Sequence, residues 1–201
     1  MRVAGPPLPA TPRRERPDVE AEAILALDRA DYRSALSVLM RAYGTEVYRY
    51  CRRMLSDPER AQDVLQNTFV QAYEGLSRFA RRSSLRAWLF GIARHRCLDD
   101  AKLWRRWRLR VDSVETLPEP RSPERPAEDG VLERQWRAVL ERCLHELTAR
   151  VRDAVVLRYV EGYPYTEMSL ICNERPATLQ ARVARALPLL RRCLERSGFA
   201  R

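Results

Sequence analysis

A proline-rich, acidic stretch divides the chain into two blocks with helical patterning. Residues 111–130 (VDSVETLPEPRSPERPAEDG) hold four prolines and a local charge of −4, and proline interrupts helices because it lacks a backbone donor. The flanking blocks are poor in glycine and rich in Ala, Leu, Arg and Glu, which favour helix. We therefore expect an all-α protein of two small helical domains, residues 28–110 and 131–201, joined by a flexible linker over 111–130. Residues 1–27 are expected to form a largely disordered extension.

Local signals mark the ends of the helices expected in the first block. Asp31 is a suitable cap for one helix, Gly44 interrupts the pattern, and Thr45 is expected to open a second helix. The run Ser56-Asp57-Pro58-Glu59 is a strong helix start, because proline is favoured in the first helical turn. That third helix should reach Leu76. Ser84 can cap a long fourth helix that ends near Leu109.

The second block ends in the pattern of a helix-turn-helix. Thr166 is expected to cap a short helix that ends at Cys172, and Asn173 can adopt the left-handed conformation of a helix end. A longer helix should then run from about Pro176 to Arg196. Its first turns would present Thr178 and Gln180 together with Ala181, Arg182 and Arg185, side chains suited to phosphates and base edges. A packed helical hairpin with a solvated arginine face is the alternative.

The charge is distributed in three separate regions. The net charge is +10. Residues 78–110 carry a local charge of +9, residues 173–201 carry +5, and residues 55–76 carry −3. This pattern indicates two surfaces for a polyanion and a distinct surface for another partner.

Two further surfaces lie in the first block. The third helix should turn polar residues outward, including Asp63, Gln66, Asn67 and Gln71; this face is either solvated or a protein-binding surface. The following loop and helix combine cations, hydroxyls and aromatics, a mixture that suits single-stranded DNA. These residues are Phe79, Arg81, Arg82, Ser83, Ser84, Arg86, Trp88, Arg94 and His95. Trp88 is also expected to be partly structural.

Other features argue against several classes of protein. No apolar run reaches the roughly 18 residues of a membrane span, and the N-terminus lacks a signal-peptide core, so we expect a cytoplasmic protein without membrane insertion. The five cysteines are scattered without a CxxC pair, and we interpret them as reduced core residues, with a redox or metal sensor as the alternative. We expect no metal, cofactor or small-molecule substrate. With two histidines and no glycine-rich phosphate loop, an enzyme such as a metal-dependent hydrolase is disfavoured.

Two stretches of the chain resemble an extracytoplasmic-function sigma factor of the sigma-70 family. Residues 36–110 resemble its region 2 through DPERAQDVLQNTFVQAYEGLSRF (57–79) and SSLRAWLFGIARHRCLDDAK (83–102). Residues 139–194 resemble its region 4 through LHELTARVRDAVVLRYVEGYPYTEMS (144–169) and ATLQARVARAL (177–187). The two segments occur in the family's order, with a linker between them.

This resemblance implies a function and residue roles. It implies an initiation factor that binds core RNA polymerase, at the β′ clamp helices and the β flap, and promoter DNA, with an anti-sigma factor as a further partner. Asp63, Gln66, Asn67 and Gln71 would dock on polymerase. The loop and helix that carry the aromatic and basic residues named above would capture the −10 strand. The −35 element would be read by Arg175, Thr178, Gln180, Ala181, Arg182 and Arg185. An autonomous helix-turn-helix regulator is the alternative, but it leaves residues 55–110 unexplained.

Overall fold

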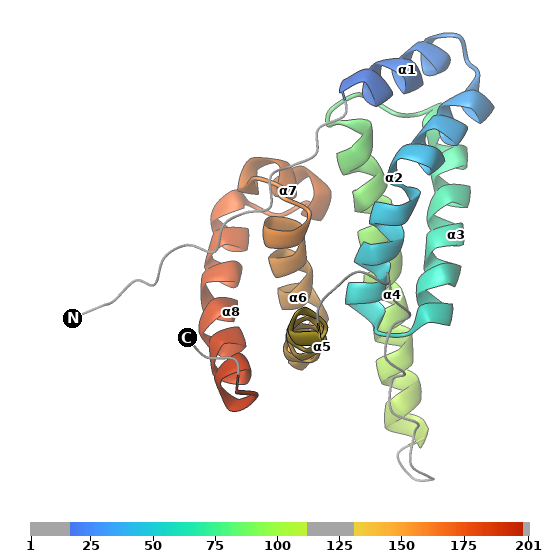
Figure 1. The fold of residues 1–201 in the computed structure, drawn as a ribbon. Helices are drawn as coiled ribbons and strands as arrows, with labels where there is room; N and C mark the ends of the chain where they lie inside the picture. The colour runs from blue at the N-terminus through green and yellow to red at the C-terminus, as the bar shows by residue number, and fades with distance from the viewer. Residues whose placement is uncertain (1–16, 112–130, 199–201) are drawn as a thin grey trace.

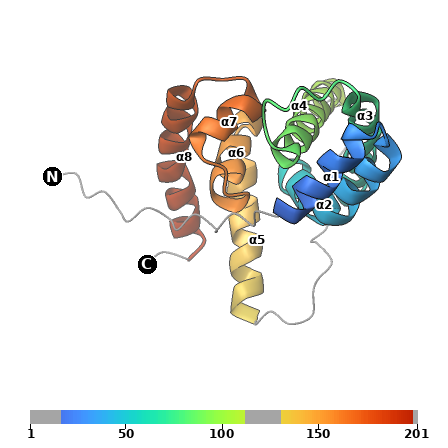
Figure 2. The ribbon, with the colours of Figure 1, turned by 90° about the horizontal axis from the view of Figure 1, so that it is seen from above.

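Helices α1 to α4 form one bundle and helices α5 to α8 form a second bundle beside it (Figures 1 and 2). The computed structural model describes residues 17–111 and 131–198, and every element within these two ranges is helical, which confirms the all-α class. The elements are α1 (Pro17–Asp28), α2 (Tyr32–Leu55), α3 (Pro58–Leu76), α4 (Leu85–Val111), α5 (Val131–Glu146), α6 (Ala149–Val155), the π-helical turn η1 (Val156–Val160), α7 (Tyr165–Cys172) and α8 (Pro176–Arg196). The expected linker lies almost wholly outside the described residues.

Several helix ends follow from single polar side chains. Asp31 caps α2 by accepting a hydrogen bond from the Ser34 amide at 3.0 Å. Asp57 caps α3 by accepting from the Glu59 and Arg60 amides at 2.9 and 3.1 Å, and Pro58 occupies the first turn. These caps satisfy amides that have no partner inside the helix, so both predicted helix starts are confirmed.

Two predicted helix boundaries are wrong. Gly44 does not interrupt the helix, because α2 continues through it to Leu55. A glycine inside a helix costs about 1 kcal/mol, and here the buried side chains of Tyr43 and Val47 hold both sides of it against the core. Thr166 does not cap α7, because the helix begins at Tyr165 and Pro164 occupies the cap position, two residues earlier than predicted. The fixed φ of proline suits that boundary.

The N-terminal extension also differs from the expectation. Residues 17–28 form α1, which packs on α2 with Ala23 fully buried. The charge and proline content of the whole extension predicts disorder, but residues 17–28 alone contain enough apolar side chains to form a helix. The expectation of disorder therefore fails for residues 17–27, while residues 1–16 lie outside the described part of the chain.

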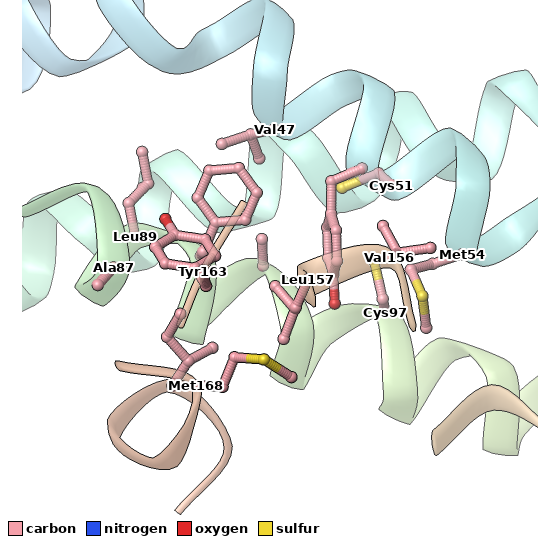
Figure 3. Close-up of a cluster of buried hydrophobic side chains, with 14 of the residues drawn as sticks. Val47, Cys51, Met54, Ala87, Leu89, Cys97, Val156, Leu157, Tyr163 and Met168 are labelled. Carbon is pink, nitrogen blue, oxygen red and sulfur yellow. The ribbon is translucent and has the colours of Figure 1, made fainter. Parts of the chain in front are cut away.

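A single apolar core joins the two bundles. Tyr163 and Leu157, from the second bundle, are fully buried near Val47 and Leu89 of the first (Figure 3). The Tyr163 ring meets the Phe90 ring edge-on, with centroids 5.6 Å apart. Burying one such side chain contributes about 1.5–3 kcal/mol. The two bundles are therefore joined by a shared hydrophobic core and not only by surface contacts.

The cysteines are not all reduced. Cys143 of α5 and Cys193 of α8 form a disulfide with a Cα–Cα distance of 5.6 Å, so that prediction is wrong for this pair. Their separation of 50 residues gives no sequence signal, and only the packing of α5 against α8 brings them together. Cys51, Cys97 and Cys172 are buried free thiols, as expected of core residues.

Candidate nucleic-acid and polymerase interfaces

The second bundle contains a helix-turn-helix built from α7 and α8. Asn173 ends α7 in the left-handed conformation, with φ of 51°, and α8 starts at Pro176. Among the side chains exposed on the turn and the first three turns of α8 are Arg175, Thr178, Gln180, Ala181 and Arg185. Leu179 and Val183 on the opposite face are buried. The exposed surface therefore has the polar and cationic groups that duplex DNA requires.

Arg182 lies on the edge of this surface and is held by a neighbouring carboxylate. Its Nη1 donates to Glu174 Oε1 at 3.0 Å, and its side chain is only 14% exposed. The guanidinium holds the pKa of Glu174 below its ordinary value, chiefly through this hydrogen bonding. Glu174 also lies 3.6 Å from the Arg94 guanidinium of the first bundle, so one carboxylate links the turn of the helix-turn-helix to α4.

The outer face of α3 is open. Asp63, Gln66 and Asn67 are exposed. Gln71 is half-buried and accepts a hydrogen bond from Arg96 Nε at 3.0 Å, so it is tied to α4. The face borders a groove lined by apolar side chains of α2 and α3, among them Met40, Phe69, Val70 and Tyr73. A polar ridge beside an apolar groove suits a protein partner better than a nucleic acid.

The loop between α3 and α4 carries exposed cations and contributes one ring to an aromatic pair. Arg81 and Arg82 are exposed, and Ser83 and Ser84 are half-buried. The rings of Phe79 and Trp88 lie 5.3 Å apart.

Trp88 also has a structural contact with the end of α3. Its ring lies so close to Gly75 that a Cβ there would meet it at 3.0 Å. Trp88 is half-buried, in agreement with a partly structural role. His95, about two turns further along α4 than Trp88, is 70% exposed and lies 3.1 Å from Asp99.

Arg86 lies inside the boundary between the two bundles. Its side chain is 6% exposed and pairs with Glu46 of α2 at 3.1 Å and with Glu161 of the second bundle at 3.2 Å. The guanidinium also stacks over the Tyr163 ring, 4.6 Å from its centroid. Burial raises the pKa of Glu161 to about 7, against the lowering influence of Arg86.

Arg94 has a similar position further along α4. Its Nε donates to Asp153 at 2.6 Å, and Asp153 also accepts from the Tyr50 hydroxyl at 2.8 Å. Asp153 is fully buried, and desolvation raises its pKa although Arg94 lowers it. In this arrangement Arg86 and Arg94 face carboxylates of the second bundle rather than solvent.

The carboxylates opposite α4 were missed by sequence reasoning. Glu161 and Asp153 pair with residues 75 and 59 positions away, and a single sequence carries no signal of such pairing. Glu20 of α1 was also missed, because it stands in a stretch interpreted as disordered. The one sequence signal for these carboxylates is the position of Asp153 between the apolar residues Val151 and Val155, which favours a buried side chain.

Within residues 17–111 and 131–198, no cluster of three or more metal-ligating side chains occurs. No helix among these residues is both long enough and apolar enough to span a membrane.

The fold places a helix-turn-helix, a motif of DNA-binding proteins, in the second of two helical bundles. Residues 39–108 match the family model for Sigma-70 region 2, and residues 137–190 match the model for Sigma-70, region 4. The "Probable RNA polymerase sigma-C factor" of Mycobacterium bovis is 31% identical over 84% of this chain and 89% of its own length. The "ECF RNA polymerase sigma factor SigX" of Bacillus subtilis is 24% identical over 79% and 82%.

Two solved structures share the fold. The sigma factor RpoE of Bartonella quintana, solved with the anti-sigma factor NepR, has a TM-score of 0.63 and 24% identity, covering 78% of this chain and 94% of that one. CnrH, solved with the cytosolic domain of CnrY, has a TM-score of 0.60 and 22% identity, covering 89% and 96%. The chain belongs to the sigma-70 family and is an extracytoplasmic-function (ECF) RNA polymerase sigma factor, which directs transcription initiation. This function is not that of an autonomous regulator, since region 2 accounts for the first bundle.

Proposed function

We propose that the three surfaces of this sigma factor divide the work of initiation. The exposed face of α3, with Asp63, Gln66 and Asn67, docks on the β′ clamp helices of core polymerase, and region 4 contacts the β flap. The loop 77–84 and α4 capture the non-template strand of the −10 element. The start of α8 reads the −35 element in the major groove.

The exposed polar surface of α8 carries the −35 part of this proposal. Thr178, Gln180 and Arg185 are exposed to solvent, while Leu179 and Val183 are buried and anchor the helix. Gln and Arg can each make two hydrogen bonds to a purine edge in the major groove. Arg175 stands just before the helix, where it can contact a phosphate.

Capture of the −10 strand needs cations that track phosphates and aromatic surfaces that receive unstacked bases. Arg81 and Arg82 are exposed beside the Phe79–Trp88 pair, which supports this role for the loop. Unstacking a base costs a few kcal/mol, and stacking on these rings offsets part of that cost. His95, which is exposed on α4 as Trp88 is in part, is proposed to contact the strand as well.

The proposal includes an opening step. Arg86 and Arg94 are assigned to the −10 strand, yet both are paired with carboxylates of region 4. They become available only when region 4 leaves α4. The face of α3 that docks on polymerase takes no part in this contact, so docking can precede opening.

The partners and location of the protein follow from its role. Core polymerase and promoter DNA are the proposed partners, which places its action in the cytoplasm. An anti-sigma factor is proposed as a third partner, because both structural neighbours were solved with proteins that bind them. The protein supplies recognition and strand capture, and the chemistry of RNA synthesis belongs to polymerase, so we propose no enzymatic activity of its own.

The test is run-off transcription with purified core polymerase on fragmented genomic DNA, with and without this protein. Discrete start sites that appear only with the protein are expected, and their upstream sequences define the −10 and −35 elements. Arg185→Ala should weaken these starts, whereas Arg191→Ala, further along α8, should leave them unchanged. Absence of discrete starts, together with specific duplex binding without polymerase, would favour the autonomous regulator instead.

A further inference from the structure

Helix α1 contacts the −10 loop near its middle and the first turn of α4 that follows it. Glu20 accepts two hydrogen bonds from the first turn of α4, with Oε2 bonded to the Leu85 amide and Oε1 to the Arg86 amide, each at 2.9 Å. Asp28, at the other end of α1, forms an ion pair with Arg81 in the loop. The region 2 family model begins at residue 39, so it assigns nothing to α1.

The Glu20 contacts complete the cap of α4. The first amides of a helix have no partner inside it. The Ser84 hydroxyl accepts from the Ala87 amide at 3.0 Å, and Glu20 accepts from the two amides before it. A carboxylate also interacts favourably with the positive end of the helix dipole. The start of α4 is therefore fixed by a side chain that comes from 65 residues earlier in the chain.

The Asp28 contact restrains an unusual backbone. Arg81 has φ of 52°, in the left-handed region that a residue with a Cβ enters at a cost and keeps only where its surroundings hold it. Asp28 and Arg81 are each about half exposed, at 52%, so their ion pair adds little stability. Its effect is to direct the loop, which carries the exposed cations Arg78, Arg81 and Arg82.

We propose that Glu20 is a positioning residue for capture of the −10 strand, with Asp28 in a smaller supporting role. This inference rests on the proposed function of the loop 77–84. By capping α4, Glu20 sets where the helix begins, and with it the place of Ser84 and of Trp88, whose amide bonds to the Ser84 carbonyl at 2.9 Å. Without this cap the loop gains conformational freedom, and the strand must restrict that freedom when it binds.

The experiment measures binding of a fluorescent oligonucleotide, the non-template −10 strand of a promoter mapped by run-off transcription, to reconstituted holoenzyme. Glu20→Ala should weaken this binding about fivefold, the scale of a lost helix cap. Glu20→Gln retains one acceptor oxygen and should fall between Glu20→Ala and the wild type. Asp28→Ala should weaken binding about twofold. The affinity for core polymerase and for −35 duplex should stay unchanged.

Glu22→Ala is the matched control. Glu22 stands on the same helix and pairs only weakly with exposed Arg41, at 3.4 Å, so this variant should bind the strand as the wild type does. Three results would overturn the proposal. Unchanged strand binding in Glu20→Ala would remove the role, and tighter binding would make Glu20 a competitor of DNA phosphate. An equal loss of polymerase, −35 and strand binding with a lower thermal midpoint would make it merely structural.

Failure of the proposed function has a different signature. In that case the wild-type holoenzyme itself yields no discrete start sites and does not prefer the −10 strand over a scrambled one. Wild-type holoenzyme that binds the strand while Glu20→Ala binds it equally well overturns the positioning role alone.

Discussion

Region 2 has two proposed binding faces, and one is exposed while the other is covered by region 4. The α3 face is exposed at Asp63, Gln66 and Asn67, and no described residue of region 4 pairs with these three side chains. On α4, by contrast, Arg86 is buried against Glu161, and the largely covered Arg94 pairs with the buried Asp153. A protein can therefore leave one binding surface ready while its own second domain covers another.

Electrostatics explain why the covered face is stable without being permanent. A buried ion pair recovers little more than the cost of removing both charges from water. The carboxylates of region 4 occupy the arginines as phosphates would, yet they stay attached to a domain that can move. The following experiments test this difference between the open and the covered face.

The largest effect is expected from Asp153→Asn. The substitution preserves the shape of the side chain but removes the buried charge with which Arg94 pairs most closely, so that Glu174, at 3.6 Å, remains its nearest carboxylate. Breaking a buried pair costs about 3–5 kcal/mol. Region 4 should separate from α4, which small-angle scattering would record as a larger radius of gyration. Asp63→Asn makes the same charge change on the open face and should leave the chain compact. If Asp153→Asn is equally compact, the pair does not hold the regions together.

The second effect is a dependence of closure on pH. The pKa of Glu161 is raised to about 7 from 4.5, first by burial and partly by Glu46, while Arg86 and Arg53 oppose the shift. The closed form therefore holds the proton more tightly than the open form. Its extra stability is fully present below pH 4.5 and is lost as pH rises through 7. The difference corresponds to about 3 kcal/mol over the whole range.

Fluorescence energy transfer between dyes on regions 2 and 4, recorded from pH 4.5 to 8.5, would measure this loss. Glu161→Gln is the matched variant, and its profile should lack the step. His145, whose pKa burial lowers to about 4, is neutral through most of this range, and below pH 6.5 its resistance to protonation acts in the opposite direction. The difference between the wild-type and Glu161→Gln profiles removes its contribution. Identical profiles would show that Glu161 does not govern closure.

A smaller effect is expected on the open face. Asp63→Ala should weaken binding to core polymerase by about 2 kcal/mol, the scale of an interface hot spot, without changing the compactness of the free chain. Fluorescence anisotropy of a labelled chain titrated with core polymerase measures this loss. Glu59→Ala, on the first turn of the same helix, serves as the control. Equal effects of the two substitutions would indicate a general charge effect rather than a docking site.

The smallest effect concerns the link between the two DNA-binding surfaces. Glu174→Ala releases Arg182 and removes a negative charge beside the −35 surface, so affinity for −35 duplex should rise about twofold to threefold, in the range of surface ion pairs. Glu195→Ala removes a carboxylate that pairs with Arg191 far along α8, at 2.9 Å. That control should not change duplex affinity. A loss of affinity in Glu174→Ala would mean that Glu174 orients Arg182 for DNA.

The sequence by itself determined most of the helices and the order of the two regions. Helical periodicity and caps such as Asp31 and Asp57 act over three or four residues, so they are visible in a single chain. The same holds for the turn at Asn173 and for the exposed side of α8, where Thr178 and Arg185 lie as expected. These features depend on neighbours in sequence. The resemblance to a known family then connected them with a function.

Only the tertiary structure decided which of these surfaces are covered. Arg86 was expected in contact with DNA on the strength of its residue type, but its environment depends on Glu161, 75 residues away. The continuous helix through Gly44, the cap from Glu20 and the Cys143–Cys193 disulfide likewise arise from packing between distant segments. Burial and ion pairing depend on which atoms meet in space, and a local pattern carries no record of partners that far along the chain.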